Sequence, residues 1–498
     1  MENGNNELEE KMLGLGNETS KPTFKEEEEM KRQTLLDTYN FNAMKSVISD
    51  NQLRPINILG LNLIGADGKF RDSFLKQQLS PLLEHINDGG EHLTLSKVLE
   101  NIDKINFNLM KTDCISGMGC QLSIPEQQPL NIFYPDLMNI VVNMQVIPVK
   151  KFFMKIGTNV GNGEGDGYVK LQWKNIFGGG ESLDLDTNLS SNEFKMRSSR
   201  SQYLINYSSP VFNNADLKFN AIFYHSSRNI DYTSYHQESI EGMTLKVGTN
   251  FLPIENKFNH EISIENLIRS IDLKHSFSTY RNNTLMNDFF LFNAGDSFKS
   301  SFVYSIFKDC RTSKYIFDDK GYYMRFSNEL SLFSKHKFMK NSFDYSKGCK
   351  IGQNLTFNFN FKTGIINSIE TDLIHPMDKF QLGGPNDIKG WMIAGMGPKQ
   401  MNMSVGGNYF HAIGLNLFSN LPYYRDSNLK LHAFTNIGKL TNKIEPNIFK
   451  DNGVSLGFGL SYNHPMAAFE LNWAVPIVGN TNDHFRKGIQ WGIGLSFL

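Results

Sequence analysis

The sequence predicts an all-β membrane barrel of about 16 antiparallel strands, closed on itself and preceded by one small α+β domain. From about residue 151 to the C-terminus, apolar and polar residues alternate in short segments, a period of two that is typical of antiparallel strands. The polar positions keep Lys, Asp, Asn and Gln throughout, and a hydrated barrel interior accepts such side chains. Before Lys150, apolar residues instead recur every three or four positions, as in helices packed on a sheet.

Composition narrows the function classes. Lys plus Arg number 50 and Asp plus Glu number 51, a balance that argues against a nucleic-acid partner. No stretch approaches the ~20 consecutive apolar residues that a membrane helix requires. The content of 39 Phe and 18 Tyr fits aromatic girdles at the faces of a bilayer as well as a large aromatic core, so composition alone does not separate the two.

No constellation of residues for catalysis or cofactor binding is visible. The 12 His are dispersed, no Ser-His-Asp spacing stands out, and the Gly clusters do not lie between a strand and a helix. The scattered Cys114, Cys120, Cys310 and Cys349 indicate neither a disulfide framework nor a metal site, so we expect unreactive thiols. The sequence therefore predicts a protein that is not an enzyme and uses no metal or cofactor.

Residues 1–50 are predicted to form an acidic, mostly disordered tail. They include the run Glu26 to Glu29 and cannot bury enough apolar area to order residues 1 to about 33, after which a short helix could follow. A solubilising role is favoured over a docking role. The N-terminus has no basic region followed by an apolar core, so no secretory signal is expected.

Residues 51–150 are predicted to form the small α+β domain. A strand near residues 56–61 ends at the turn Gly65-Ala66-Asp67-Gly68. Two helices follow, separated by Gly89-Gly90, and Thr94 or Ser96 can cap the second. Their apolar faces consist of Phe70, Phe74, Leu75, Leu79, Leu82 and Leu83, and of Leu95, Val98, Leu99, Ile102, Ile105 and Leu109. Strands near 120–124 and 139–149 complete a fold with both helices on one face of a sheet.

Residues 151–498 are predicted to form the barrel. In the clearest segments, Phe469, Leu471 and Trp473 alternate with Glu470 and Asn472. An open sheet edge would leave backbone groups unpaired in lipid, so the barrel has to close. A soluble all-β domain is the alternative reading of the same pattern. The candidate strands lie near 152–161, 167–176, 181–191, 198–210, 216–228, 239–251, 258–271, 274–283, 291–309, 322–333, 349–369, 402–422, 429–440, 453–464, 467–477 and 487–498.

The inserted segment 370–401 does not alternate. A loop of this length within a compact architecture is usually functional or disordered. Its apolar residues, among them Leu382, Ile388 and Trp391, do not suit a solvated loop, and its glycines suggest tight turns. We expect this segment to fold into the barrel lumen, with Lys389 facing an acidic residue of the wall.

The sequence FQLGGPNDIKGW at residues 380–391 resembles the signature loop of the barrel-assembly superfamily, also called the bacterial surface antigen or BamA-like family. In that family a Leu-Gly-Gly and a Val/Ile-Arg-Gly-Phe/Tyr tetrad precede the twelfth strand. The matching positions in this chain are Leu382, Gly383, Gly384, Ile388, Lys389, Gly390 and Trp391. The likeness is strongest over residues 377–498 and weaker over 156–183. Residues 50–150 resemble a single POTRA domain, as in the family's mitochondrial members.

Two departures from the family pattern affect how the loop binds the wall. Lys389 stands where the family usually has Arg, and a Lys keeps the charge but lacks the planar fork that binds a carboxylate at two points. Trp391 replaces a smaller aromatic residue. Glu470, which faces the lumen by the alternation, is the expected partner of Lys389.

The C-terminus resembles the β-signal of mitochondrial barrels, which runs polar, any, Gly, any, any, hydrophobic, any, hydrophobic. Gln490, Gly492, Leu495 and Phe497 occupy those places. The resemblance implies a weak seam between the first and last strands, which Gly492 and Gly494 would weaken further.

The resemblance implies a membrane insertase that assembles β-barrel precursor proteins into the mitochondrial outer membrane, by pairing client strands at this lateral seam. Implied partners are the precursors, the lipid bilayer and accessory subunits of the sorting and assembly machinery (SAM). Three alternatives stay open at this point: a plastid-envelope translocation channel of the same superfamily, a passive outer-membrane pore, and a soluble β-rich binding protein.

Overall fold

The computed structural model divides the chain into two compact units. The first comprises Met1–Ile64, Leu79–Ile105 and Gly119–Gln145, and the second comprises Gly65–Gln78, Asn106–Met118 and Val146–Leu498. The structure describes residues 24–66, 68–87, 93–125, 137–161, 164–191, 199–230, 236–273, 288–311, 320–370, 373–401, 403–421, 428–443, 450–464 and 467–494.

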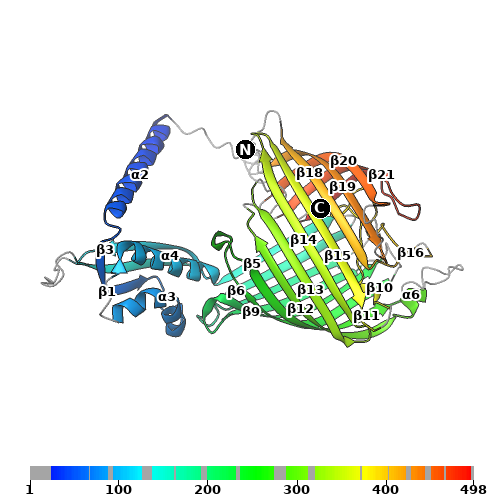
Figure 1. The fold of residues 1–498 in the computed structure, drawn as a ribbon, viewed down its shortest axis with the longest axis horizontal. Coiled ribbons are helices and arrows are strands. Elements are labelled where there is room, and N and C mark those ends of the chain that lie inside the picture. Colours follow the sequence, from blue (N-terminus) through cyan, green and yellow to red (C-terminus); the bar gives the residue numbers. More distant parts are fainter. Residues whose placement is uncertain are drawn as a thin grey trace, which may run out of the picture. The chain divides into compact units, whose positions relative to one another are not determined.

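Helix α2 spans Phe24–Asp50 (Figure 1). The prediction of a mostly disordered tail over residues 1–50 is therefore wrong for residues 24–50, while residues 1–23 lie outside the described part. The acidic run Glu26–Glu29 lowers hydropathy without opposing helix formation, since Glu and Lys are good helix formers. None of the helices in the described part of the chain is both long enough and apolar enough to cross a membrane.

The elements of the small α+β domain follow the predicted order, with one short strand added. They are β1 (Pro55–Ile64), α3 (Asp72–Asn87), β2 (Leu93–Thr94), α4 (Leu95–Lys111), β3 (Ile115–Ser123) and β4 (Met138–Pro148). The sheet order is β2-β1-β4-β3, with β1 parallel to β4. Thr94 Oγ1 accepts from Lys97 N–H at 3.4 Å, so Thr94 caps α4. Phe74 of α3, Val98 of α4 and Val142 of β4 are fully buried.

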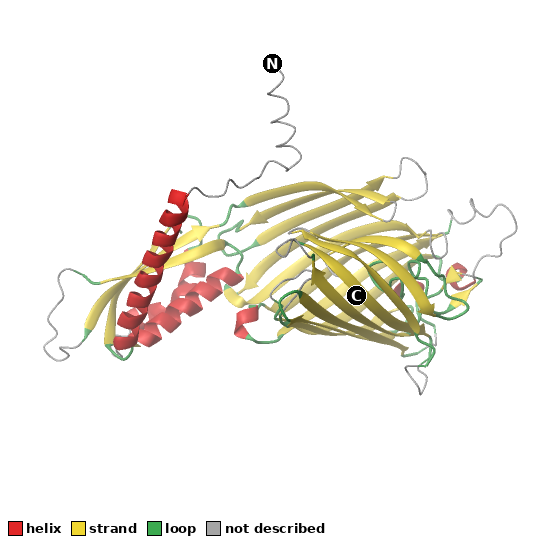
Figure 2. Ribbon diagram, turned by 90° about the horizontal axis from the view of Figure 1, so that it is seen from above, coloured by secondary structure: helices red, strands yellow, loops and turns green. Residues whose placement is uncertain are grey.

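The second unit contains one 16-stranded antiparallel sheet (Figures 1 and 2). Its order is β22-β21-β20-β19-β18-β15-β14-β13-β12-β11-β10-β9-β8-β7-β6-β5, so every strand pairs with its neighbour in the chain. The two ends of this order, β5 and β22, approach each other to within 8 Å between Cα atoms, and the sheet is rolled into a barrel. The strands are β5 (Phe152–Gly161), β6 (Glu164–Lys174), β7 (Ser182–Ser191), β8 (Ser199–Val211), β9 (Asn214–Ile230), β10 (His236–Thr249), β11 (Asn259–Asp272), β12 (Gly295–Asp309), β13 (Tyr322–Ser334), β14 (Phe338–Ile351), β15 (Leu355–Ser368), β18 (Tyr409–Asn420), β19 (Leu429–Thr441), β20 (Gly453–His464), β21 (Ala467–Val478) and β22 (Gly488–Gly494).

The barrel wall has an apolar exterior and a polar interior. On β21, Leu471 and Trp473 are about half exposed, whereas Glu470 and Asn472 are buried. This is the reverse of a soluble protein, where exposed strand positions are polar. An apolar outer band with a polar lumen is the arrangement that spans a membrane, and it confirms the predicted fold class.

The predicted strand positions need two corrections. Strand β14 was missed, and its last residues were assigned to the strand predicted at 349–369, which the structure shows as β15. The strand predicted at 402–422 is the short β17 (Met403–Ser404) followed by β18. The strand expected at 274–283 lies outside the described residues, and β11 pairs directly with β12. The described sheet has 16 strands, the number predicted.

Candidate functional site: the lumen loop and the seam

Residues 370–401, named the lumen loop below, connect β15 to β18, the eleventh and twelfth strands of the barrel. The loop holds a short 3-10 helix, η2 (Pro376–Asp378), and strand β16 (Lys399–Gln400), which pairs with β17. Several of the loop's apolar side chains are buried. They form a buried cluster with the barrel wall that consists of Leu382, Ile388, Trp391, Met396, Ala412 and Leu440.

The loop backbone is tightly folded at its paired glycines. Gly383 and Gly384 have φ of 111° and 128°, values that side-chain-bearing residues rarely adopt. Gly384 N–H donates to Ile388 O at 3.2 Å, and Met396 N–H donates to Leu382 O at 3.1 Å. A Cβ on Gly383 would lie 2.8 Å from Met392 O. The Leu-Gly-Gly part of the motif therefore makes the turn that presents residues 388–391.

Lys389 and Glu470 form an ion pair inside the barrel. Lys389 Nζ lies 3.3 Å from Glu470 Oε2, and both side chains are at most 1% exposed. The ammonium also lies 5.0 Å from the centre of the Phe434 ring, within range of a cation–π interaction. The structure thus brings together the two residues that alternation and charge had suggested, one from the loop and one from β21.

The loop also binds the segment that leads into the last strand. Gly390 N–H donates to the side-chain Oε1 of Gln490 at 3.2 Å, and Arg486 N–H donates to Gly390 O at 2.9 Å. Gln490 Nε2 in turn donates to Arg486 O at 2.8 Å. Trp391 makes an isolated β-bridge with Phe485. Residues of the motif are therefore hydrogen-bonded to the strand at one edge of the seam.

The seam itself is described only in part. Of the predicted seam residues, Gln490 and Gly492 are buried in β22, and Gly494 is the last residue of that strand. Leu495 and Phe497 lie outside the described residues, so their predicted place in the β-signal stays a prediction.

A second anchor of the lumen loop was missed by the sequence analysis. Asp378 Oδ2 of η2 lies 2.5 Å from Arg269 Nη1 of β11, and Asp378 Oδ1 lies 3.2 Å from Lys299 Nζ of β12. All three side chains are buried. Lys340 of β14 donates to Asp378 O at 2.8 Å. Burial alone would raise the pKa of Asp378, but Lys299 and Arg269 hold it below its ordinary value. The lumen loop is thus held to the walls formed by β11–β14 and by β21.

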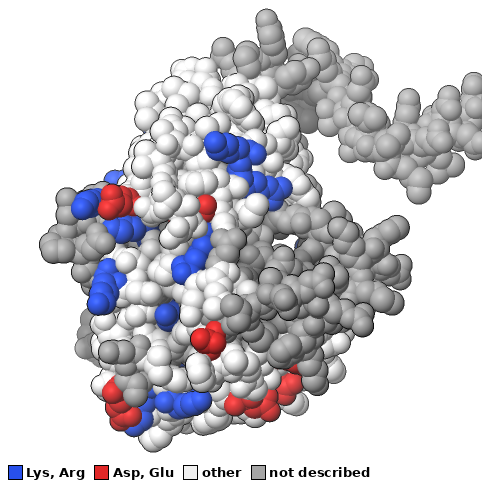
Figure 3. Space-filling model, turned by 90° about the vertical axis from the view of Figure 1, so that its right-hand side faces the viewer, with Lys and Arg blue, Asp and Glu red and all other residues white. Residues whose placement is uncertain are grey.

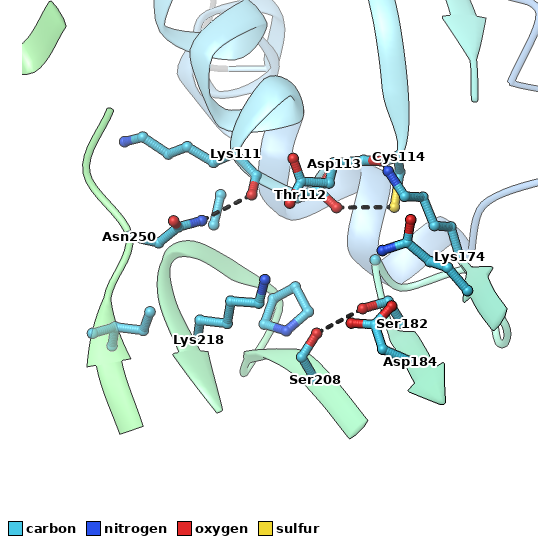
Figure 4. Close-up of a pocket in the computed structure, with 15 residues that line it drawn as sticks. Lys111, Thr112, Asp113, Cys114, Lys174, Ser182, Asp184, Ser208, Lys218 and Asn250 are labelled. Atoms are coloured by element: carbon cyan, nitrogen blue, oxygen red, sulfur yellow. Dashed lines mark hydrogen bonds between the residues drawn. The ribbon is translucent and has the colours of Figure 1, made fainter. Parts of the chain in front are cut away.

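A small polar cavity of about 110 Å³ lies in the second unit, lined by residues that include Lys174, Lys218 and Asn250 (Figure 4). Asn250 Nδ2 donates to Lys111 O at 2.8 Å. Cys114 also lines the cavity, and its Sγ donates to Thr112 O at 3.2 Å. This cavity contains none of the predicted site residues.

Cys114 gives a prediction about thiol reactivity. Burial raises the pKa of its thiol to about 11, so at pH 8 only about one molecule in a thousand carries the reactive thiolate. We expect iodoacetamide to alkylate the exposed Cys120 much faster than Cys114 in the folded protein, with both reacting in denaturant. Peptide mass spectrometry of the alkylated protein measures both sites. Equal rates before unfolding would contradict the buried position.

Charged side chains of both signs are interspersed among uncharged ones on the face shown in Figure 3. Within the ranges that the structure describes, no group of three or more His, Cys, Asp or Glu side chains is arranged to hold a metal ion. The described site offers hydrogen bonding and ion pairing between the lumen loop and the wall.

A 16-stranded antiparallel sheet that is apolar outside, with a lumen loop bonded to its last strand, is a membrane β-barrel. The chain belongs to the Omp85 superfamily, whose domain model matches residues 175–497.

Individual relatives agree with this family. The chain is 29% identical over 477 residues to the sorting assembly machinery 50 kDa subunit of Saccharomyces cerevisiae, covering 90% of this chain and 95% of that protein. It is 27% identical to a SAM50-like protein of Schizosaccharomyces pombe, covering 92% and 94% of the two chains. Among solved structures, BamA from Haemophilus ducreyi lacking POTRA domains 1–3 matches with a TM-score of 0.65 at 14% identity, over 88% of this chain and 84% of that one.

Proposed function

We propose that this protein is an insertase that assembles β-barrel precursors into the mitochondrial outer membrane. The proposal is supported by similarity to sorting and assembly proteins over nine-tenths of the chain. The observation that carries the mechanism is the attachment of the lumen loop to the last strand, where Gly390 N–H bonds the side chain of Gln490. Clients are β-barrel precursor proteins, and accessory subunits of a sorting and assembly complex are the expected partners.

The mechanism follows from what a sheet edge can do. If β5 and β22 separate, each exposes unpaired backbone N–H and C=O groups, and an incoming strand can pair with them. Burial of the client's apolar face in lipid then supplies the driving free energy, so no nucleotide is required. The lumen loop keeps the interior side of the seam in one geometry while the edge is open.

An open metabolite pore is a poorer explanation of the same geometry. A pore needs a hydrated path, whereas here Leu382, Ile388 and Trp391 pack as a buried apolar cluster against the wall. A loop that packs on the wall and bonds the last strand through Gly390 suits control of a strand edge better than passage of solutes.

Depletion of the protein tests the proposal. We expect the amounts of mitochondrial outer-membrane β-barrels, including pore proteins, to fall, because their precursors find no edge on which to pair. Outer-membrane proteins anchored by a single helix serve as the control and should stay at their normal level. Unchanged β-barrel amounts after depletion would exclude an insertase, and carbonate extraction shows in the same samples that the protein is membrane-embedded.

The contact between Gln490 and Gly390 gives a prediction of its own. Gln490→Met keeps the side-chain volume but leaves the buried Gly390 N–H without its acceptor, a cost of about 1–3 kcal/mol. We expect precursor assembly to slow several-fold. Gln490→Glu retains an acceptor for Gly390 N–H and should assemble precursors faster than Gln490→Met. The rate of conversion of an imported precursor to its folded form measures both, and equal rates for the two variants would contradict the coupling.

A further inference from the structure

The ion pair between Lys389 and Glu470 is backed by a hydrogen-bonded relay of wall residues. Asn472 Nδ2 donates to Glu470 Oε2 at 2.7 Å. Asn472 Oδ1 lies 3.1 Å from His432 Nδ1. These three wall residues are each 2% or 3% exposed, so the relay is removed from water.

The direction of the relay is fixed from its carboxylate end. Glu470 can only accept, so Asn472 must present its Nδ2 to Glu470 and its Oδ1 to His432. His432 Nδ1 therefore carries a hydrogen and donates it to Asn472. One orientation of the histidine thus specifies one orientation of the amide, which in turn holds the carboxylate in place.

A glycine in the intervening strand allows His432 to reach Asn472. In the sheet register His432 of β19 lies opposite Gly459 of β20, and Gly459 lies opposite Asn472 of β21. A Cβ on Gly459 would overlap the backbone oxygen of Leu471 and the side chain of Asn472. The side chains of His432 and Asn472 therefore meet across β20, because that strand has no side chain at this position.

Aromatic packing fixes the imidazole ring. Its centroid lies 4.5 Å from that of Phe418, with 12° between the ring planes. The ring centroid of Phe434, two residues further along β19, lies 5.3 Å from that of His432. The Phe434 ring also contacts the Lys389 ammonium. His432 consequently has little freedom to turn away from Asn472.

We propose that His432 is a positioning residue, which acts through Asn472 to hold Glu470 in the orientation that receives Lys389 of the lumen loop. The inference rests on the proposed function, because it concerns how the loop is seated for assembly. A lysine contacts a carboxylate as a single point charge and cannot fix its orientation as the planar guanidinium of arginine does. In this chain the wall supplies that orientation.

Amine labelling of the detergent-solubilised full-length protein tests the inference. His432→Phe keeps an aromatic ring to pack on Phe418 but removes the hydrogen bond to Asn472, and we expect acetylation of the Lys389 amine by acetic anhydride to rise several-fold. His432→Asn keeps a donor near the Nδ1 position and should restore low labelling. Gly459→Ala, whose Cβ would overlap both Leu471 O and the Asn472 side chain, should raise Lys389 labelling as His432→Phe does.

Two controls separate loss of position from loss of fold. The Lys308 amine, buried on the wall over the rings of Phe258 and Tyr322, is the internal reference, and its labelling should not change. His411→Phe alters another buried lumen histidine, whose Nε2 lies 3.2 Å from Asn452 Oδ1, and should leave Lys389 protected. A variant in which Lys308 labelling also rises has lost its fold, and the remaining variants then decide the question.

The outcomes also separate the inference from the proposed function. Unchanged Lys389 labelling in folded His432→Phe and Gly459→Ala would overturn the positioning role, as would failure of His432→Asn to restore protection. If Lys389 becomes reactive while precursor assembly proceeds at the normal rate, the positioning role holds and the importance of the seated loop for assembly is refuted.

Discussion

Lys389→Ala is expected to lower precursor assembly at least about tenfold, which corresponds to ~1.4 kcal/mol in the activation free energy. The substitution leaves Glu470 as a buried charge without its cation, and breaking a buried pair in this way costs about 3–5 kcal/mol. The loop then leaves the wall, while the barrel stays in the membrane because its strand pairing is untouched. Assembly of an imported pore precursor in isolated mitochondria measures the effect.

A matched control exists elsewhere in the lumen. Lys246 and Glu261 form a wall ion pair at 3.1 Å between β10 and β11, partly accessible to water, and the lumen loop is not involved. Lys246→Ala should therefore assemble precursors normally. The double variant Lys389→Met with Glu470→Gln removes both charges, so its heat stability should recover while assembly stays low. Normal assembly in Lys389→Ala would count heavily against the role of the loop.

Gly390→Ala is expected to lower precursor assembly nearly as much as Lys389→Ala does, for a steric reason. Gly390 has φ of 95°, a conformation that costs a side-chain-bearing residue about 1–3 kcal/mol. Its Cβ would also lie 3.2 Å from Ser455 Cβ and 3.4 Å from Pro476 N, so the loop would have to lift from the wall. Lifting separates Gly390 from Gln490 and so uncouples the loop from the last strand.

Gly352→Ala is the control for backbone strain alone. Gly352 has φ of 77° in the turn between β14 and β15, and a Cβ there would meet nothing within 4 Å. Gly352→Ala and Gly390→Ala thus introduce comparable backbone strain, but only Gly390→Ala displaces the lumen loop. The same import assay compares them, and the account fails if Gly352→Ala is impaired as severely as Gly390→Ala.

The sequence was sufficient to predict the parts of the fold that follow local periodicity. The alternation of Glu470 and Asn472 with Leu471 and Trp473 assigned the inner and outer faces of β21 correctly. Strand β14 was missed because its pattern is broken, with the apolar Phe338 on the lumen side. Phe338 is fully buried there and packs with Ile366 of β15 and with Ile374 of the lumen loop. The lumen is apolar where the loop enters it, and no local pattern indicates that.

Of the site, only the contact made by the loop motif could be predicted from the sequence. Lys389 and Glu470 could be matched because one is the charged residue of a recognised loop and the other an acid on a polar face. Asp378 and Arg269, in contrast, are 109 positions apart and meet only because the rolled sheet brings β11 beneath the loop. The contact between His432 and Asn472 likewise depends on the strand register and on Gly459, which alternation alone does not reveal.

Disulfide cross-linking of a precursor arrested during insertion tests the central claim most directly. Single cysteines are placed at lipid-facing positions by Ile489→Cys in β22, Ile156→Cys in β5 and Phe326→Cys in β13, in a protein whose native cysteines are replaced by serine. A cysteine in the last strand of the client should cross-link to β22 or β5, and shifting it by one residue should abolish the bond because neighbouring side chains face opposite sides. Cross-links to β13 as strong as those at the seam, or a client that folds without contacting either edge strand, would contradict assembly at the seam.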